Sequence, residues 1–312
     1  MPIHDPLWFR ADQWLTGGSG AAAAEPALAV VGVPNSASSL SPSQAYRTPA
    51  RLRDVLGRLS TFDGDTGLDL RELPVVDRGD WPVADLDMHA VPAAVEDAAA
   101  RLDPSPVHAF LGGDNAITRP LVRGLARALG GDLRSIGVLT LDAHHDVRTL
   151  DRGPTNGTPI RGLIEDGLPG PHVAQVGILA FANSREYRNY CDEHEIWVAT
   201  MADVERRGVD VVTGEALARL ASRCERILVD VDVDVLDRAF APGCPGSRPG
   251  GMSPRQLFTA TRICGRHPKV CAADFVEVDP ERDVAEITLL NTATALLSFA
   301  AGLAERLAGT AP

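Results

Sequence analysis

Lysine, cysteine pairs and aromatic residues are all scarce in this chain of 312 residues. Lys269 is its only lysine, and 30 basic residues face 42 acidic ones, which leaves a net charge of -12. A surface that neutralises phosphates needs the opposite sign, so nucleic acid is not an expected partner. The five cysteines include no C-x-x-C pair, which favours reduced thiols and a cytoplasmic location over a disulfide framework or a structural zinc site.

Long hydrophobic runs are missing as well. The N-terminus has neither the basic start nor the apolar run of a signal peptide. The most apolar segment, residues 287–303, contains three threonines and an asparagine and is short for a membrane span. We therefore expect a buried helix there and no membrane partner. With 45% hydrophobic and 23% charged residues, the chain has the composition of a folded globular protein.

Short runs rich in β-branched residues alternate with segments of helical periodicity. Such apolar runs suit strands buried on both faces, and their alternation with helices predicts an α/β fold with a mostly parallel sheet. We predict one domain over residues 1–312, with residues 1–26 as an N-terminal extension that includes a loop or spacer at 17–26. Predicted strands are 27–33, 107–111, 136–141, 174–178, 227–232 and 270–276, and predicted helices are 49–59, 92–102, 119–129, 158–165, 185–194, 214–224, 254–265 and 284–307.

Acidic residues stand at or just after the ends of four predicted strands, as Asp114, Asp142, Asp232 and Glu277. The carboxyl ends of parallel strands form the ligand crevice of an open α/β sheet. We therefore expect these four strands to deliver carboxylates to one edge.

Two acidic clusters surround these positions. The segment LDAHHDVR, residues 141–148, has Asp142, His144 and Asp146 at every second position, which in an extended chain puts three side chains on one side. The segment LVDVDVDVLD, residues 228–237, has aspartates at 230, 232, 234 and 237 and predicts the same geometry. Each cluster alone could also be a solvated acidic strand end.

Neighbouring carboxylates at one edge call for cations. A buried pair within about 4 Å costs on the order of 4 kcal/mol at an effective dielectric near 20. Oxygen ligands with one imidazole and no thiolate indicate a hard or borderline divalent ion, Mn²⁺ rather than Zn²⁺. Two clusters are consistent with two ions and with a hydroxide between them as the nucleophile.

Three motifs resemble the signatures of the ureohydrolases, the arginase and agmatinase superfamily: GGDN at 112–115, DAHHD at 142–146, and DVDVDVLD at 230–237 followed by APG. The resemblance spans residues 30–285 and implies a three-layer α-β-α arginase-like fold. Within the superfamily, the formimidoylglutamase group is the most similar. The stretches that carry this similarity are SASSLSPSQAYRTP at 36–49, DAHHDVR at 142–148, GPTNGTPIR at 153–161, FANSREYRNY at 181–190 and LDRAFAPGCPGSRPGGM at 236–252.

This resemblance implies a metal-dependent hydrolase that cleaves N-formimino-L-glutamate to L-glutamate and formamide, in histidine catabolism, by attack of a metal-bridging hydroxide. It also implies two Mn²⁺ per subunit, a small amino-acid-derived substrate and a homo-oligomer. Two alternatives stay open. One is another ureohydrolase that acts on a guanidino substrate and releases urea, and the other is a metal-poor relative without turnover.

The resemblance also assigns roles to individual residues. Glu277 matches the glutamate that hydrogen-bonds the amidine nitrogen and orients the carbon for attack, a role that suits a carboxylate beside a cationic group. Asp146 is the candidate to hold or shuttle the proton of the hydroxide, and Asp142 and Asp232 are expected to bridge the two ions. The implied metal ligands are Asp142, His144, Asp146, Asp232 and Asp234, together with Asn115.

Asn115 departs from the family pattern, because it stands where the G-G-D-H turn has a histidine ligand. A carboxamide oxygen can bind a hard cation, but it is a weaker donor than imidazole for a transition ion. Three outcomes are open: Asn115 ligates through its oxygen and both ions bind, the first site is weak or empty, or hydrolysis has been lost.

Arginine residues separate the possible substrates. Arg148 follows a metal ligand by two residues, where arginases carry a neutral residue, and its guanidinium could bind a carboxylate of the substrate bidentately. Arg161 and Arg47 are weaker candidates for the second carboxylate, with a plain surface role as the alternative. Asn156 stands where arginases have a histidine, and Asn183 is a candidate to hold the amino-acid end of the substrate.

Overall fold

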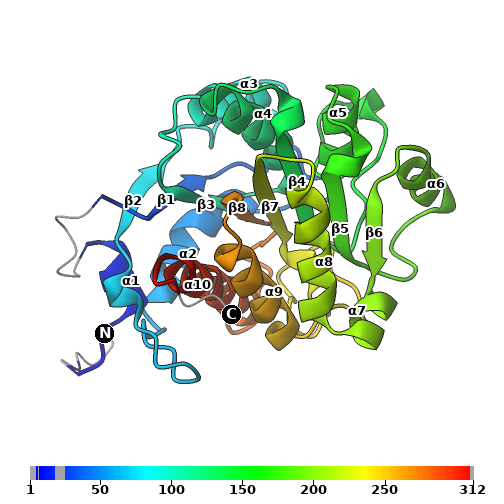
Figure 1. The fold of residues 1–312 in the computed structure, drawn as a ribbon. Coiled ribbons are helices and arrows are strands. Elements are labelled where there is room, and N and C mark those ends of the chain that lie inside the picture. The colour runs from blue at the N-terminus through cyan, green and yellow to red at the C-terminus, as the bar shows by residue number, and fades with distance from the viewer. Residues whose placement is uncertain (1–4, 6, 18–24, 310–312) are drawn as a thin grey trace.

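The computed structural model describes residues 5, 7–17 and 25–309. At its centre lies one sheet of eight strands in the order β2-β1-β3-β8-β7-β4-β5-β6, with helices on both faces (Figure 1). Every pair of neighbouring strands in the sheet is parallel, which confirms the predicted α/β class. The strands are β1 (Leu28–Val33), β2 (Val75–Asp80), β3 (Val107–Gly112), β4 (Ile136–Leu141), β5 (Val173–Ile178), β6 (Trp197–Thr200), β7 (Arg226–Asp232) and β8 (Val270–Val276).

The helices divide into two layers, each packed on its own cluster of buried apolar residues. One layer comprises α3 (Val91–Ala99), α4 (Thr118–Ala128), α5 (Pro159–Glu165) and α6 (Arg185–Glu193). The other comprises α1 (Ala11–Leu15), α2 (Thr48–Leu56), α7 (Met201–Arg207), α8 (Val209–Ala221), α9 (Pro254–Arg266) and α10 (Ile287–Leu307).

All six predicted strands are present. They could be predicted because strands covered by helices on both faces carry continuous apolar runs. The two edge strands, β2 and β6, were not predicted. Their sequences, VVDRGD and WVAT, are short and only partly buried, so neither an apolar run nor a clear alternation marks them. The short helices α1 and α7 also lack a predicted counterpart.

Part of the predicted N-terminal extension packs onto the domain. In α1, Trp14 is fully buried and its indole Nε1 donates a hydrogen bond to the backbone oxygen of Leu73 at 3.0 Å. Most of the predicted spacer at residues 17–26 lies outside the described residues. All five cysteines are free.

The expected buried C-terminal helix is α10. Within the described part of the chain it is the one helix long and apolar enough to span a membrane by length and composition. Most of its apolar window is nevertheless buried, and its inner face belongs to the core cluster shared with α9 and α2. That packing is typical of a core helix.

Candidate metal centre and active site

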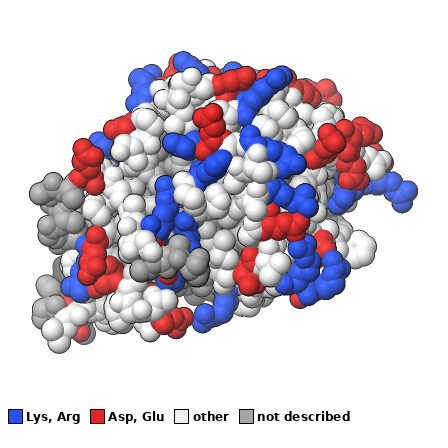
Figure 2. Space-filling model, in the orientation of Figure 1, with Lys and Arg blue, Asp and Glu red and all other residues white. Residues whose placement is uncertain are grey.

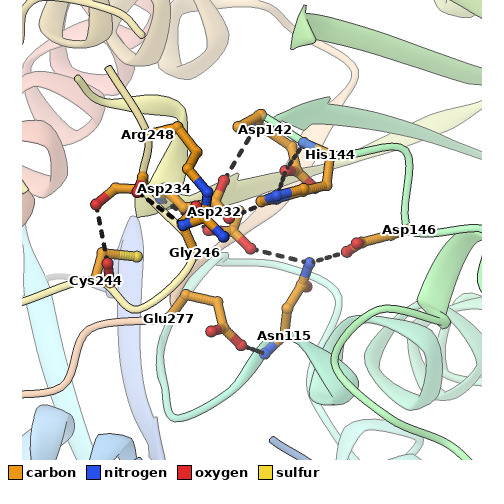
Figure 3. Close-up of polar contacts among 12 residues, drawn as sticks. Asn115, Asp142, His144, Asp146, Asp232, Asp234, Cys244, Gly246, Arg248 and Glu277 are labelled. Carbon is orange, nitrogen blue, oxygen red and sulfur yellow. Dashed lines mark hydrogen bonds and ion pairs between the residues drawn. The ribbon is translucent and has the colours of Figure 1, made fainter. Parts of the chain in front are cut away.

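The four central strands, β3, β8, β7 and β4, lie side by side and all end at the same edge of the sheet. The loops that leave these ends carry the acidic clusters (Figure 3). Asp142 follows β4, Asp232 ends β7 and Glu277 follows β8, as predicted. Asp114, after β3, turns away: its carboxylate accepts hydrogen bonds from the backbone of Ser38 and Ala116.

The first cluster converges, but not by strand alternation. The chain leaves the sheet after Leu141, and Asp142, His144 and Asp146 lie in an irregular loop. Asp142 Oδ1 accepts the His144 backbone N–H at 2.5 Å, and Asp146 has a left-handed backbone with φ of +53°. Left-handed non-glycine residues are strained and collect at functional sites. The loop's turns, rather than an extended chain, bring the three side chains together.

Two residues of the second cluster join the first. Asp232 Oδ1 accepts the Asp234 backbone N–H at 2.8 Å, and Asp234 Oδ2 lies 2.7 Å from Nδ1 of His144. The backbone of Gly246 packs closely against the Asp234 carboxylate, since a Cβ at position 246 would lie only 2.2 Å from Asp234 Oδ2. Asp230 and Asp237, predicted to share this geometry, do not reach the cluster. Asp230 is paired with Asp274 of β8 in the sheet register, and Asp237 accepts the backbone N–H of Gly250.

The ligand atoms form two triads that share Asp142. Oxygen and nitrogen atoms of Asp142, His144 and Asp234 lie within 4.8 Å of one another, and so do those of Asp142, Asp146 and Asp232. Asp142 Oδ2 is buried and has no hydrogen-bond partner among the described residues. A buried carboxylate oxygen without a partner, next to two groups of potential ligands, calls for a positive partner that these residues do not supply.

The pKa values of the buried carboxyl groups also indicate a site for cations. Burial, followed by the charge of Asp234, raises the pKa of Asp142 to about 7. Burial also raises the pKa of Asp146 and of Asp232 well above the ordinary range, with neighbouring carboxylates adding to it. The Asp234 carboxylate raises the pKa of His144 to about 12. Buried acids that repel each other gain most from divalent cations, so the donor set fits a hard or borderline metal ion.

Asn115 lies against this cluster, and its amide nitrogen faces the carboxylates. Nδ2 donates to Asp146 Oδ2 at 2.6 Å and to Asp232 Oδ2 at 3.3 Å. Its oxygen, Oδ1, points the other way and accepts a hydrogen bond from Thr118 Oγ1 at 2.7 Å. The structure therefore brings Asn115 to the predicted position, but without its oxygen toward the carboxylates.

Glu277 is held on the opposite side of the site by two hydrogen bonds. Its Oε1 accepts from the Asn115 backbone N–H at 2.8 Å and from Asn156 Nδ2 at 2.9 Å. The backbone of Glu277 is left-handed, with φ of +69°, and its N–H donates to the oxygen of Gly113. Burial, then the charge of Asp114, raises the pKa of Glu277 to about 8. Both side-chain bonds use Oε1, which leaves Oε2 for a ligand.

A cavity of about 150 Å³ opens onto the cluster. Most predicted site residues line it, whereas Asn115 and Asp142 are buried and are not part of the lining. The predicted residues that line the cavity are His144, Asp146, Arg148, Asn156, Asn183, Asp232, Asp234 and Glu277.

Two predicted arginines do not line this cavity. Arg161 donates to the Val147 backbone oxygen at 2.8 Å and stacks on the ring of Tyr190, while Arg47 pairs with Glu281 at 2.9 Å. Both side chains therefore serve contacts within the protein.

Asn183 acts on the loop beside the site. Its Oδ1 accepts the His145 N–H at 2.9 Å and its Nδ2 donates to the Ala143 oxygen at 2.9 Å, so its carboxamide braces the segment around His144. Its predicted contact with the substrate stays a prediction.

Arg248 lines the cavity and was missed from the sequence. It lies in the loop after β7, between Gly246 and Gly250, and its Nη1 donates to three backbone oxygens, those of residues 245, 246 and 247. The stretch 236–252 resembles formimidoylglutamases as a whole, so this arginine was open to assignment. No spacing rule singled it out from its neighbours.

Comparison with known proteins agrees with this site. The model of the arginase family matches residues 26–302. A formimidoylglutamase of Halalkalibacterium halodurans is 40% identical over 280 residues, covering 88% of this chain and 86% of that protein. The crystal structure of formimidoylglutamase from Bacillus subtilis has a TM-score of 0.89 at 31% identity, covering 97% of this chain and 94% of that one. A Trypanosoma cruzi formiminoglutamase with Mn²⁺ shares the fold, with a TM-score of 0.81 at 22% identity, covering 90% and 94%.

The chain belongs to the arginase family. The arginase-like three-layer fold expected from the motifs is confirmed by the sheet and its two helical layers. Within the family, the resemblance to formimidoylglutamases is confirmed as well, by the relative at 40% identity and by the Bacillus subtilis structure.

Proposed function

We propose that this protein is a formimidoylglutamase, which hydrolyses N-formimino-L-glutamate to L-glutamate and formamide. The observation that carries the proposal is a pair of cations, Arg148 and Arg248, in the lining of an otherwise acidic cavity. Among the described residues, neither guanidinium is ion-paired with a carboxylate. The substrate brings two carboxylates and one cationic formimino group, which matches two guanidiniums without a carboxylate partner and a buried acidic cluster.

Arg148 is fixed along its length and free at its end. Its side chain lies across Gly157, where a Cβ would come within 2.6 Å of Arg148 Cδ, and its guanidinium lies over the ring of Tyr187 with its centre 5.9 Å away. The exposed guanidinium keeps its planar set of donors for a ligand. Arg148 is thus placed to bind a carboxylate bidentately.

Arg248 is held at one nitrogen only. Nη1 is occupied by backbone oxygens, at 2.9 Å for Gly246, whereas Nε and Nη2 have no hydrogen bond to a described residue. In Figure 3 its side chain lies with the Asp232 and Asp234 carboxylates and Gly246. We assign it the second carboxylate of the substrate, in place of Arg161 and Arg47.

Asp142, His144, Asp146, Asp232 and Asp234 would hold the metal, which we propose to be two Mn²⁺ per subunit. When bound, such ions supply positive charge and lower the pKa of a water molecule. The chain's own groups do the rest. Oε2 of Glu277 accepts an N–H of the formimino group and turns its carbon toward the cluster. Asp146 takes up the proton released by the attacking water and delivers it to the departing nitrogen of glutamate as the C–N bond breaks.

Substituting either arginine tests the substrate. Arg148→Gln and Arg248→Gln should each raise KM for N-formimino-L-glutamate by about 10- to 100-fold, because a charged hydrogen bond contributes about 1.5–3 kcal/mol. N-formimino-4-aminobutyrate lacks the α-carboxylate, so only one of the two substitutions should raise KM for this compound. Arg47→Gln is the matched control, since Arg47 pairs with Glu281 away from the cavity. Release of urea from guanidino substrates, without glutamate formation, would replace this proposal with the ureohydrolase alternative.

Metal content tests the proposed centre. After dialysis against Mn²⁺, elemental analysis should find two ions per chain. Asn115→His should tighten the weaker of the two, because imidazole is the better donor to a transition ion. A single ion in the wild type, with the second recovered in Asn115→His, would show that the natural residue leaves one site nearly empty. No bound ion in either form would favour the metal-poor relative.

Three further parts of the proposal have other grounds. A place in histidine breakdown and assembly into a homo-oligomer rest on the resemblance alone, and a cytoplasmic location rests on the absence of a C-x-x-C pair among the five cysteines. Light scattering coupled to size-exclusion chromatography would give the number of subunits.

A further inference from the structure

Thr118, at the start of α4, is fully buried beneath the candidate metal centre. Its Oγ1 lies 2.7 Å from Asn115 Oδ1 and 3.0 Å from Asp274 Oδ2. A hydroxyl has one proton to give, and an amide oxygen can only accept. In this arrangement the Thr118 hydroxyl therefore faces two acceptors, Asn115 Oδ1 and Asp274 Oδ2, with a single proton to share between them.

The other end of the Asn115 carboxamide shows why it is turned this way. Nδ2 faces Asp146 Oδ2 and Asp232 Oδ2, which are acceptors. The amide oxygen in that place would face two carboxylates with no donor between them. With a divalent cation among the carboxylates the preference reverses, since the cation repels the amide N–H groups and attracts the oxygen. Binding through Asn115 thus requires the carboxamide to turn over.

We propose that Thr118 is a positioning residue that allows the Asn115 carboxamide to turn over, from a state that caps Asp146 and Asp232 with its nitrogen to a state that offers its oxygen to a divalent cation. In the second state Nδ2 donates to Thr118 Oγ1, and the Thr118 hydroxyl donates its hydrogen bond to Asp274 Oδ2 alone. Because a hydroxyl both donates and accepts, Thr118 satisfies the buried amide in either orientation. The inference rests on the proposed metal centre, but not on the identity of the substrate.

Thr118→Val keeps the side-chain shape and removes the hydroxyl. The loaded state then leaves a buried N–H without a partner, which is tolerated less well than the unpartnered oxygen of the metal-free state. The affinity for one of the two Mn²⁺ ions should therefore fall by about 10-fold or more, in the range seen when partners of metal ligands are removed. Thr118→Ser, which keeps a hydroxyl, should bind Mn²⁺ like the wild type. The readout is the electron paramagnetic resonance signal of free Mn²⁺ during titration of full-length protein without substrate.

Two controls separate positioning from general damage. Thr213→Val makes the same change at another buried helical threonine, whose hydroxyl has no hydrogen-bond partner among the described residues, and should leave Mn²⁺ affinity unchanged. In an Asn115→Ala background, Thr118→Val should have no further effect, since the two residues act as one unit.

Unchanged Mn²⁺ affinity in Thr118→Val overturns the proposal. An equal loss of affinity with and without Asn115 also overturns it, because the effect would then be structural. Since no substrate is present, neither result depends on whether the enzyme cleaves N-formimino-L-glutamate. A failure of the proposed function in the activity assay would be seen separately.

Discussion

Asp142→Asn should abolish binding of both metal ions and reduce hydrolysis to background, while making the metal-free protein more stable. Asp142 is the residue common to both triads, so its loss removes a ligand from each ion. A carboxamide offers one neutral oxygen in place of a carboxylate shared by both triads, and Mn²⁺ binds it far less well. Metal content by elemental analysis and glutamate release on the same samples provide the first two readouts.

The gain in stability has a separate cause. In the metal-free protein Asp142 is buried, one of its oxygens has no partner, and its pKa is raised to about 7, so folding disfavours its charged form. The penalty appears above the pKa of the unfolded chain, grows as pH rises and is complete above pH ~7. Asparagine removes this penalty, so the free energy of unfolding of the metal-free protein should rise by about 2–4 kcal/mol at pH ~8 and by less at pH ~5. Urea unfolding in EDTA measures the difference.

Asp237→Asn is the matched control for this substitution. Asp237 belongs to the same acidic segment but accepts backbone hydrogen bonds from Ala239 and Gly250 outside the cluster. It should keep both Mn²⁺ ions and gain no stability. If Asp142→Asn destabilised the metal-free protein, the carboxylate would have to be satisfied by contacts that the structure does not show.

The spacing of the acidic residues predicted which side chains meet, but not how. Asp142, His144 and Asp146 were expected on one face of an extended strand, yet they lie in a loop after β4. Their convergence depends on the left-handed residue Asp146 and on the hydrogen bond from the His144 backbone to Asp142. Period-two spacing also included Asp230, which the sheet register pairs with Asp274 below the site. The pattern of residue types thus predicted which side chains form the site better than it predicted the conformation of the backbone that carries them.

Contacts distant in the chain were beyond sequence reasoning. The Asn115 carboxamide contacts Thr118 and, through it, Asp274 of β8, and no local motif joins these residues. Arg248 becomes notable only once the fold places it in the same cavity as Arg148. Buried strands were predictable because both faces demand apolar residues, whereas the edge strands β2 and β6 are under no such demand.

Glu277→Gln should lower kcat/KM for N-formimino-L-glutamate by about 10²- to 10³-fold, the usual effect of removing one preorganised electrostatic contact from a transition state. Glutamine keeps the shape of the side chain and an oxygen that can accept from the Asn115 N–H and from Asn156. What it loses is the negative charge opposite the cationic formimino group, a charge that keeps this group protonated and its carbon open to attack.

Mn²⁺ content separates this role from that of a ligand. Glu277 is in neither triad, so Glu277→Gln should bind Mn²⁺ like the wild type while losing turnover. Glu281→Gln is the matched control, because Glu281 lies nearby in the chain and pairs with Arg47 on the surface, and its activity should not change. Loss of metal together with activity in Glu277→Gln would place Glu277 among the ligands. Full activity would mean that the formimino group is oriented by another residue, for which Asn156, bonded to the same carboxylate, is the nearest candidate.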